Sequence, residues 1–357
     1  MYALPRVGHP ESVNTAATTR APLTHVPLST RELPSLEPLK PPWPGTFEEV
    51  GTARLHVRRT PGPDGVPAVY VHGLGGSSTN WTDLAALLAP VAGGTAPDLP
   101  GFGYSEPEKG FDFSLQAHAE VVARHIETGF SGVRVAEPPA RGGAPAVAAG
   151  APVHLLGNSM GGAIALLIAE RRPELVKTLT LISPAMPDRR PDPRRLSDPR
   201  MALAYLPLVG ARVRAQLAAL GPRERAAQVI KLCFADPSRF PAERLDELAE
   251  EHGARAGLTW AAPAMARSTF AIFRAWSTLG KASLWSAAPR VQAPTLVVWG
   301  REDRVISVRR ALRTARVIPK ARLLVLPRTG HVAQMERPVV VAKAVLGMWE
   351  HVEAGTW

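Results

Sequence analysis

The stretch from Val153 to Leu166 constrains the fold more than any other part of the chain. It opens with a short apolar run, Val153–Leu156, which has the length and composition of a buried strand. The segment after Met160 is rich in small and apolar residues and ends before Pro173, which is typical of a buried helix. A Gly-x-Ser-x-Gly pattern, Gly157–Gly161, lies between them, so the chain must turn sharply from strand to helix there.

Ser159 occupies the centre of this turn. A turn this sharp holds its central residue in a strained backbone conformation, and side chains two positions to either side would collide. Gly157 and Gly161 remove those side chains, and the helix beginning near Met160 would aim free backbone N–H groups at the reacting atom. Strand, turn and helix in this order are the context of a nucleophile elbow. The motif alone leaves one alternative open, a glycine-rich turn whose serine only caps a helix.

The charge balance argues against a nucleic-acid reader. Lys plus Arg is 42 against 31 for Asp plus Glu, a net charge of +11, but the excess is spread along the chain. It forms no basic block interleaved with aromatic residues, so we expect no nucleic-acid partner. The excess of positive charge fits a role in solubility. The alternative is that it attracts the protein to anionic lipid at a membrane surface.

The remaining composition favours a cytoplasmic protein without a cofactor. Cys233 is the single cysteine, so no internal disulfide can form. The first ten residues lack an apolar signal-peptide core, and no apolar run is long enough to span a bilayer. No His, Cys or Asp cluster has metal-ligand spacing, and no Gly-x-Gly-x-x-Gly follows a strand to cradle a dinucleotide. The oligomeric state is left open.

Alternating strand and helix patterns predict an α/β fold, with a mostly parallel central sheet covered by helices on both faces and an inserted helical cap. The core domain is expected over 47–184 and 289–357, and its first strands form a hairpin over 47–60. Residues 1–46 form a Pro-rich arm, disordered or draped over the surface. A low-complexity surface insertion is expected over 131–150, and the cap, or lid, occupies 185–288. Within the cap we expect helices over 201–220, 223–234, 242–252 and 263–279.

Two further polar residues follow strands of the predicted sheet. Asp303 comes shortly after the strand ending at Trp299, and His331 follows the last strand, so both should lie at the carboxyl edge beside Ser159. A serine nucleophile needs a histidine base and an acid that orients it. Glu302 and Asp188 are alternative acids, although Gly-x-x-Asp spacing favours Asp303.

In this arrangement the chain resembles the α/β-hydrolase superfamily, in its capped serine esterase/lipase-like branch. The resemblance covers roughly residues 50–185 and 290–350. It implies Ser159 as nucleophile, Asp303 as orienting acid and His331 as base. It also implies an oxyanion hole made by the backbone N–H groups of Leu74 and Met160. The motifs that carry it are His72-Gly73-Leu74-Gly75-Gly76, Asp98-Leu99-Pro100-Gly101, Gly157-Asn158-Ser159-Met160-Gly161-Gly162, Gly300-x-x-Asp303 and Gly330-His331.

Other ionisable residues near these motifs are expected to be structural. His72 belongs to the loop that would form the oxyanion hole, His154 is expected to be a satisfied core histidine, and Asp98 is expected to brace its turn. Four residues of one predicted helix are expected on solvated faces: His118, His125, Glu120 and Glu127.

This set of groups suits acyl transfer through an acyl-enzyme. The cap is rich in aromatic residues, so the predicted function is cleavage of small-molecule carboxylic esters with hydrophobic acyl groups. Trp260, Phe273 and Trp276 are candidate substrate-binding residues, or else only the core of the cap. The elbow motif also resembles carbon–carbon bond hydrolases of dienoic ring-cleavage products, although the loop at 72–76 departs from their usual Gly-Pro-Gly pattern. A non-enzymatic ligand receptor on the same fold is the third alternative.

Overall fold

The computed structural model describes residues 23–130, 149–188, 212, 216 and 219–357. The insertion expected over 131–150 and the helix expected over 201–220 lie almost wholly outside the described residues.

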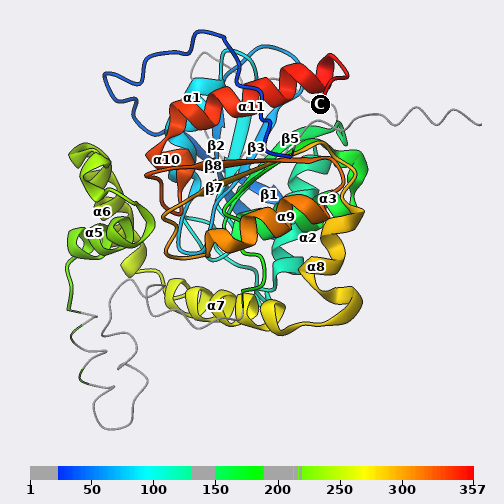
Figure 1. The fold of residues 1–357 in the computed structure, drawn as a ribbon. Coiled ribbons are helices and arrows are strands. Elements are labelled where there is room, and N and C mark those ends of the chain that lie inside the picture. Colours follow the sequence, from blue (N-terminus) through cyan, green and yellow to red (C-terminus); the bar gives the residue numbers. More distant parts are fainter. Residues whose placement is uncertain (1–22, 131–148, 189–211, 213–215, 217–218) are drawn as a thin grey trace, which may run out of the picture.

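A β-sheet forms the centre of the molecule (Figure 1). It has eight strands in the order β1-β2-β4-β3-β5-β6-β7-β8. The first two strands form the predicted antiparallel hairpin, and β2 also runs antiparallel to β4, whereas the remaining neighbours are parallel. The strands are β1 (Gly45–Val50), β2 (Ala53–Thr60), β3 (Ala68–Val71), β4 (Gly94–Pro97), β5 (Val153–Asn158), β6 (Val176–Ile182), β7 (Thr295–Gly300) and β8 (Ala321–Leu326).

Helices cover both faces of this sheet, because the central strands are apolar on both sides. Leu155 of β5 packs into one hydrophobic cluster with α2, α3 and α9, and Leu156 packs into a second cluster with α1 and α11. The core helices are α1 (Thr82–Leu88), α2 (Leu115–Glu127), α3 (Met160–Arg171), α9 (Ala311–Val317), α10 (Ala333–Glu336) and α11 (Pro338–Glu353). The predicted α/β architecture is therefore confirmed.

Of the arm expected over 1–46, residues 23–44 lie against the core, and residues 45–46 already belong to β1. Leu323 N–H of β8 donates to the Leu23 carbonyl at 2.9 Å, and Ser29 N–H donates to the Lys343 carbonyl at the same distance. The arm passes so close to α11 that a Cβ on Gly347 would lie 2.2 Å from the Pro27 carbonyl oxygen. Of the two states expected for the arm, these residues adopt the surface-draped one.

The described part of 185–288 contains helices and no strand. The helices expected over 223–234, 242–252 and 263–279 are present. Two of them, α5 (Pro222–Cys233) and α6 (Ala242–Ala256), pack side by side, and the third, α7 (Ala261–Ser277), runs along one end of the sheet (Figure 1). A short helix, α8 (Leu284–Ala287), leads back to β7. Among the described residues, none of the helices is both long and apolar enough to cross a membrane.

Helix α7 lies directly on two loops at the carboxyl edge of the sheet. A Cβ on Gly101 would lie 2.5 Å from the Cβ of Ala264, and one on Gly75 would lie 2.8 Å from the Cε of Met265. Both glycines have positive φ, +85° and +74°, so they permit the turns as well as the close approach. Helix α7 therefore lies over the carboxyl edge of the sheet at these two loops.

Candidate active site

Ser159 lies at the tip of a strained turn between β5 and α3. Its φ is 55° and its ψ is −117°, a conformation that L-residues seldom adopt. A Cβ on Gly157 would lie 2.3 Å from the Gly161 carbonyl oxygen. A Cβ on Gly161 would lie 2.1 Å from the Val71 carbonyl oxygen. The elbow geometry expected from the glycines is confirmed. The Ser159 side chain makes no capping hydrogen bond to α3, which contradicts the alternative that it only caps the helix.

His331 and Asp303 are joined by a buried hydrogen bond. The distance from His331 Nδ1 to Asp303 Oδ2 is 2.9 Å, and the two side chains are 5% and 0% exposed. Asp303 Oδ1 accepts the backbone N–H groups of Val305 at 2.8 Å and Ile306 at 2.9 Å, so the carboxylate is held from its other side. Because a carboxylate can only accept, Nδ1 carries the proton in this pair and Nε2 is left free to accept one.

Neither alternative acid has this partner among its observed hydrogen bonds. The exposed Glu302 accepts the Thr329 N–H at Oε2 at 3.1 Å. The buried Asp188 pairs with Arg310 Nη2 at 2.6 Å. Of the three carboxylates, the structure therefore joins only Asp303 to the His331 ring by a hydrogen bond.

The strand of Ser159 and the loop of His331 are tied together by Asn158. Its Nδ2 donates to the Ile182 carbonyl at 3.1 Å and to the His331 carbonyl at 3.2 Å. The hydrogen bonds of the described residues include none between Ser159 and His331, and such bonds are often long before substrate binds. Asn158 was not selected from the sequence, although its place before the serine is the signal that could have found it.

His72 orients the loop that carries Leu74. Leu99 N–H donates to His72 Nε2 at 2.9 Å, so Nδ1 carries the ring proton and donates to the Gly73 carbonyl at 2.8 Å. The peptide from Gly73 to Leu74 is planar and trans, so its N–H points away from the held carbonyl. Burial lowers the pKa of His72 to about 4, which keeps the ring neutral. His72 is structural, as expected.

The two predicted oxyanion donors border the serine. A Cβ on Gly73, the residue before Leu74, would lie 3.0 Å from the Ser159 Cβ. Met160 is the first residue of α3, where backbone N–H groups have no partner within the helix. Their joint action on a substrate oxygen stays a prediction.

Asp98 braces its turn, as expected. Its carboxylate accepts the N–H groups of Ser78 at 2.6 Å and Tyr104 at 3.0 Å, and it pairs with His56 Nδ1 at 2.7 Å. Burial alone would raise the pKa of Asp98, but the hydrogen bond and charge of His56 outweigh it and lower the pKa to about 2. His154 is likewise a satisfied core histidine, bonded through Nδ1 to Thr178 Oγ1 at 2.8 Å.

His118 and His125 do not lie on solvated faces, so that expectation was wrong. Both are fully buried on the inner side of α2, and burial lowers the pKa of each to about 3. They share the helical spacing of Leu115, Val122 and Ile126, which pack into the core, and this period was the missed signal. Glu120 is exposed, as expected, and Glu127 is partly exposed.

A carboxylate that sequence reasoning missed links the histidine loop to the cap. Glu336 of α10 is buried, and its Oε2 accepts the N–H groups of Gly330 at 2.6 Å and Ala235 at 3.2 Å, while Oε1 accepts that of Asp236 at 3.0 Å. The His331 N–H also donates to the carbonyl of Cys233, the last residue of α5, at 2.6 Å. The loop that carries His331 is thus held by residues 233–236 as well as by the core.

The three candidate cap aromatics have different surroundings. Trp276 is buried in the main hydrophobic cluster, which also contains Met160, and its Nε1–H donates to the Ala185 carbonyl at 2.9 Å. Phe273 is 57% exposed and packs edge-on against Trp276. Trp260 is partly exposed at the start of α7.

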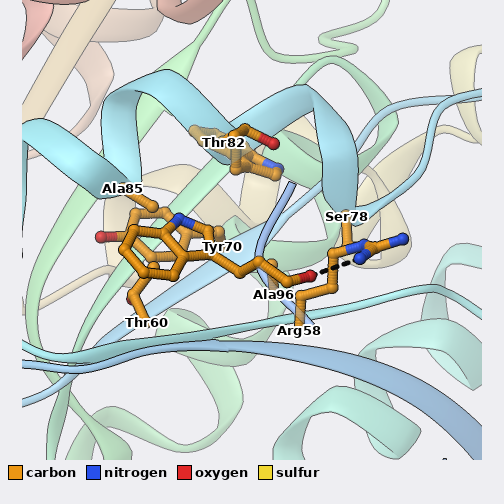
Figure 2. A pocket seen from close by; sticks show the side chains of 9 residues that line it. Arg58, Thr60, Tyr70, Ser78, Thr82, Ala85 and Ala96 are labelled. Atoms are coloured by element: carbon orange, nitrogen blue, oxygen red, sulfur yellow. Dashed lines mark hydrogen bonds between the residues drawn. The ribbon is translucent and has the colours of Figure 1, made fainter. Parts of the chain in front are cut away.

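A small pocket lies apart from this site, between α1 and strands β2, β3 and β4 (Figure 2). Tyr70 Oη, Trp81 Nε1 and Ser78 Oγ line it and find no hydrogen-bond partner among the described residues. Polar atoms in such a pocket are commonly satisfied by ordered water. None of the pocket's lining residues is a predicted site residue. Across the described ranges, no group of three or more His, Cys, Asp or Glu side chains could hold a metal ion.

Two proteins of similar sequence align with most of this chain. It is 30% identical over 84% of its length to the dihydrolipoyllysine-residue acetyltransferase component of an acetoin cleaving system from Pseudomonas putida, and it spans 67% of that relative. It is 26% identical to a 2-hydroxy-6-oxo-6-phenylhexa-2,4-dienoate hydrolase from Burkholderia cepacia, over 87% of this chain and 91% of the relative.

A solved structure and a family profile agree with these similarities. The crystal structure of a membrane phospholipase A described as a bacterial virulence factor superposes with a TM-score of 0.66, at 25% identity, over 87% of this chain and 86% of the other. The profile described as the alpha/beta hydrolase family matches residues 68–344, which include the strained serine, the Asp303–His331 pair and the intervening cap. The chain belongs to the alpha/beta hydrolase family.

Proposed function

We propose that the protein is a serine hydrolase that cleaves carboxylic esters of hydrophobic acyl groups. One observation carries the proposal: Asp303 holds His331 by a buried hydrogen bond at 2.9 Å, on a loop that Asn158 ties to the strained Ser159. A nucleophile, a base and an orienting acid are the parts that acyl transfer requires.

The reaction runs through an acyl-enzyme. Ser159 Oγ attacks the ester carbonyl carbon while His331 Nε2 takes the hydroxyl proton, and Asp303 stabilises the imidazolium that forms. The N–H groups of Leu74 and Met160 bind the oxyanion. The bond to the alcohol then breaks as His331 returns the proton to the alcohol oxygen. Water repeats the sequence: its oxygen joins the acyl carbon, its proton passes through His331 to Ser159, and the carboxylic acid leaves.

A hydrophobic acyl group suits the inner face of α7. Ile272 and Trp276 belong to the same hydrophobic cluster as Met160, and the partly buried Leu74 packs against that cluster. The similarity to a phospholipase structure supports a substrate with an apolar chain. In this proposal Phe273 and Trp260 contribute further apolar surface at the cleft, and the substrate is a small-molecule ester.

A second candidate reaction is hydrolysis of a carbon–carbon bond in a dienoic ring-cleavage product. The relative from Burkholderia cepacia, which aligns with 87% of this chain, is named for such a dienoate. The same serine, histidine and aspartate would serve in this reaction. Esters and dienoates must therefore be compared directly.

A series of nitrophenyl esters from acetate to octanoate, assayed beside a 2-hydroxy-6-oxo-dienoate, tests the proposal. We expect kcat/KM to be highest for a medium-chain ester and to vanish in Ser159→Ala, which should also lose labelling by an active-site-directed phosphonate. Preference for the dienoate would replace the ester assignment by the second candidate. Tight ligand binding without turnover of either substrate would indicate a receptor.

A further inference from the structure

Helix α6 of the cap reaches the loop that carries the Leu74 amide. Glu251 Oε2 accepts hydrogen bonds from Ser77 Oγ at 2.8 Å and from Thr79 Oγ1 at 3.0 Å. One helical turn later, Arg255 Nη1 donates to the Gly75 carbonyl at 3.3 Å. We refer to Glu251 and Arg255 together as the cap latch.

The cap latch is buried and internally paired. Glu251 is 6% exposed and Arg255 is 8% exposed, and their charged atoms lie 3.7 Å apart on one face of α6. Burial raises the pKa of Glu251, while Arg255 favours its charged form. A buried ion pair of this kind seldom stabilises a fold more than apolar residues of the same size would, so stability alone does not account for it.

The core holds the two ends of the same loop. His72 fixes the Gly73 carbonyl, and Asp98 accepts the Ser78 N–H. These contacts leave the segment from Leu74 to Ser77 projecting toward the cap, where Arg255 and Glu251 hold its carbonyl and hydroxyl groups. Each end of the loop is thus held by the core and its projecting part by α6.

We propose that Glu251 and Arg255 are positioning residues that fix the Leu74 amide for oxyanion binding, so that the closed cap completes the site. This inference rests on the proposed serine hydrolase function. The two residues act through the loop and touch no reacting atom. Losing a whole oxyanion donor costs about 10²–10³ in kcat. A displaced donor should cost less, about 10- to 100-fold.

The test is the double variant Glu251→Met with Arg255→Met, which removes both charges together with their hydrogen bonds to the loop. Glu250→Met, at an exposed position of the same helix, is the matched control. For a short nitrophenyl ester we expect kcat to fall about 10- to 100-fold in the double variant, with KM within about threefold. Hydrogen exchange should become faster at the amides of residues 74–79 and stay unchanged in α3. The control should match the wild type in all three measurements.

Two outcomes would overturn the inference. One is unchanged exchange at residues 74–79 in the folded double variant, and the other is faster exchange with unchanged kcat. The failure of the parent proposal looks different: a wild type that turns over no ester and is not labelled at Ser159. In that case, faster exchange in the double variant would still show that the cap latch supports the loop, although the hydrolase assignment would be wrong.

Discussion

Asp303 is hydrogen-bonded to the His331 ring, whereas its neighbour Glu302 is hydrogen-bonded to the Thr329 backbone. Substituting each residue in turn therefore distinguishes a loss of catalysis from a local structural change. Asp303→Asn should lower kcat about 10⁴-fold, because the amide favours the wrong imidazole tautomer and does not stabilise the imidazolium. Glu302→Gln, which alters only the hydrogen bond to Thr329, should lower kcat less than about threefold. Steady-state kinetics on a short ester distinguish them, and the reverse ranking would make Glu302 the acid.

His118 should make the fold sensitive to acid. Its ring is buried among Phe102, Phe111 and Phe113, and neither nitrogen has a hydrogen-bond partner in the part of the chain that the structure describes. Burial lowers its pKa to about 3 in the folded state, against about 6.5 when unfolded. Below pH 6.5 the unfolded chain therefore binds a proton that the folded chain does not, and stability falls by about 1.4 kcal/mol per pH unit down to about pH 3.

Urea unfolding of His118→Leu at pH 7 and pH 5 measures this effect. Relative to the wild type, the variant should lose about 2 kcal/mol less stability between the two pH values. His25→Leu, at an exposed position of the arm, is the control and should follow the wild type. An identical pH dependence in all three proteins would mean that His118 is protonated in the fold or contacts water.

At the scale of elements, α10 joins the histidine loop to the end of α5. Glu336→Gln should lower stability by about 1–3 kcal/mol, because the Gln amide presents a donor to backbone N–H groups that already donate. It should also lower kcat, since Gly330 precedes His331, the proposed base. Glu243→Gln, at an exposed position of α6, is the matched control for both thermal unfolding and ester turnover. If the variant is less stable but keeps full ester turnover, Glu336 stabilises the fold and has no role in positioning His331.

Helix α7 should select the acyl chain. Burying one methylene contributes about 0.8 kcal/mol, nearly fourfold in specificity, and a partly open cleft should give less. We expect kcat/KM to rise from acetate to hexanoate and the rise to flatten in Phe273→Ala. Phe270→Ala, which removes a still more exposed ring of the same helix, should keep the wild-type slope. Trp276→Ala tests the same point, but its buried ring also supports the fold.

If kcat/KM rises equally with acyl length in the wild type and in Phe273→Ala, Phe273 does not contact the acyl chain. Equal slopes in Trp276→Ala as well would mean that α7 has no role in acyl selection. The acetate rate should survive in every variant, because Ser159, Asp303 and His331 lie outside α7.

At the scale of the whole molecule, we expect the arm to contribute to stability and not to chemistry. Val26, Leu33 and Leu36 are partly buried against the cluster of α1 and α11. A chain that begins at Gly45 should therefore lose about 2–4 kcal/mol of stability. It should keep short-ester turnover within a few-fold at a temperature where it is folded. A chain that begins at Leu23 is the control, and differential scanning calorimetry with an ester assay compares them. If the chain that begins at Gly45 folds but has no ester turnover, the arm is required for activity.

Much of the site follows from local patterns in the sequence. Ser159 is identified by the glycines that a sharp turn requires, because a Cβ at Gly157 or Gly161 would clash with neighbouring backbone atoms. The parallel sheet and its carboxyl edge follow from alternating strand and helix patterns, which place Asp303 and His331 near the serine. These features depend on residues close together in the chain, where short-range sterics and hydrophobic period decide the conformation.

Only the tertiary structure decided the rest. Sequence spacing favours Asp303 over Glu302, but the hydrogen bond that joins His331 to Asp303 depends on which way a loop turns toward a residue 28 positions later. The burial of His118 depends on what covers that side of α2. The cap latch joins groups 174 residues apart, Ser77 and Glu251, and no local pattern encodes their meeting. Hydrogen bonds across such separations arise from the packing of whole elements, so they are visible only once the chain has folded.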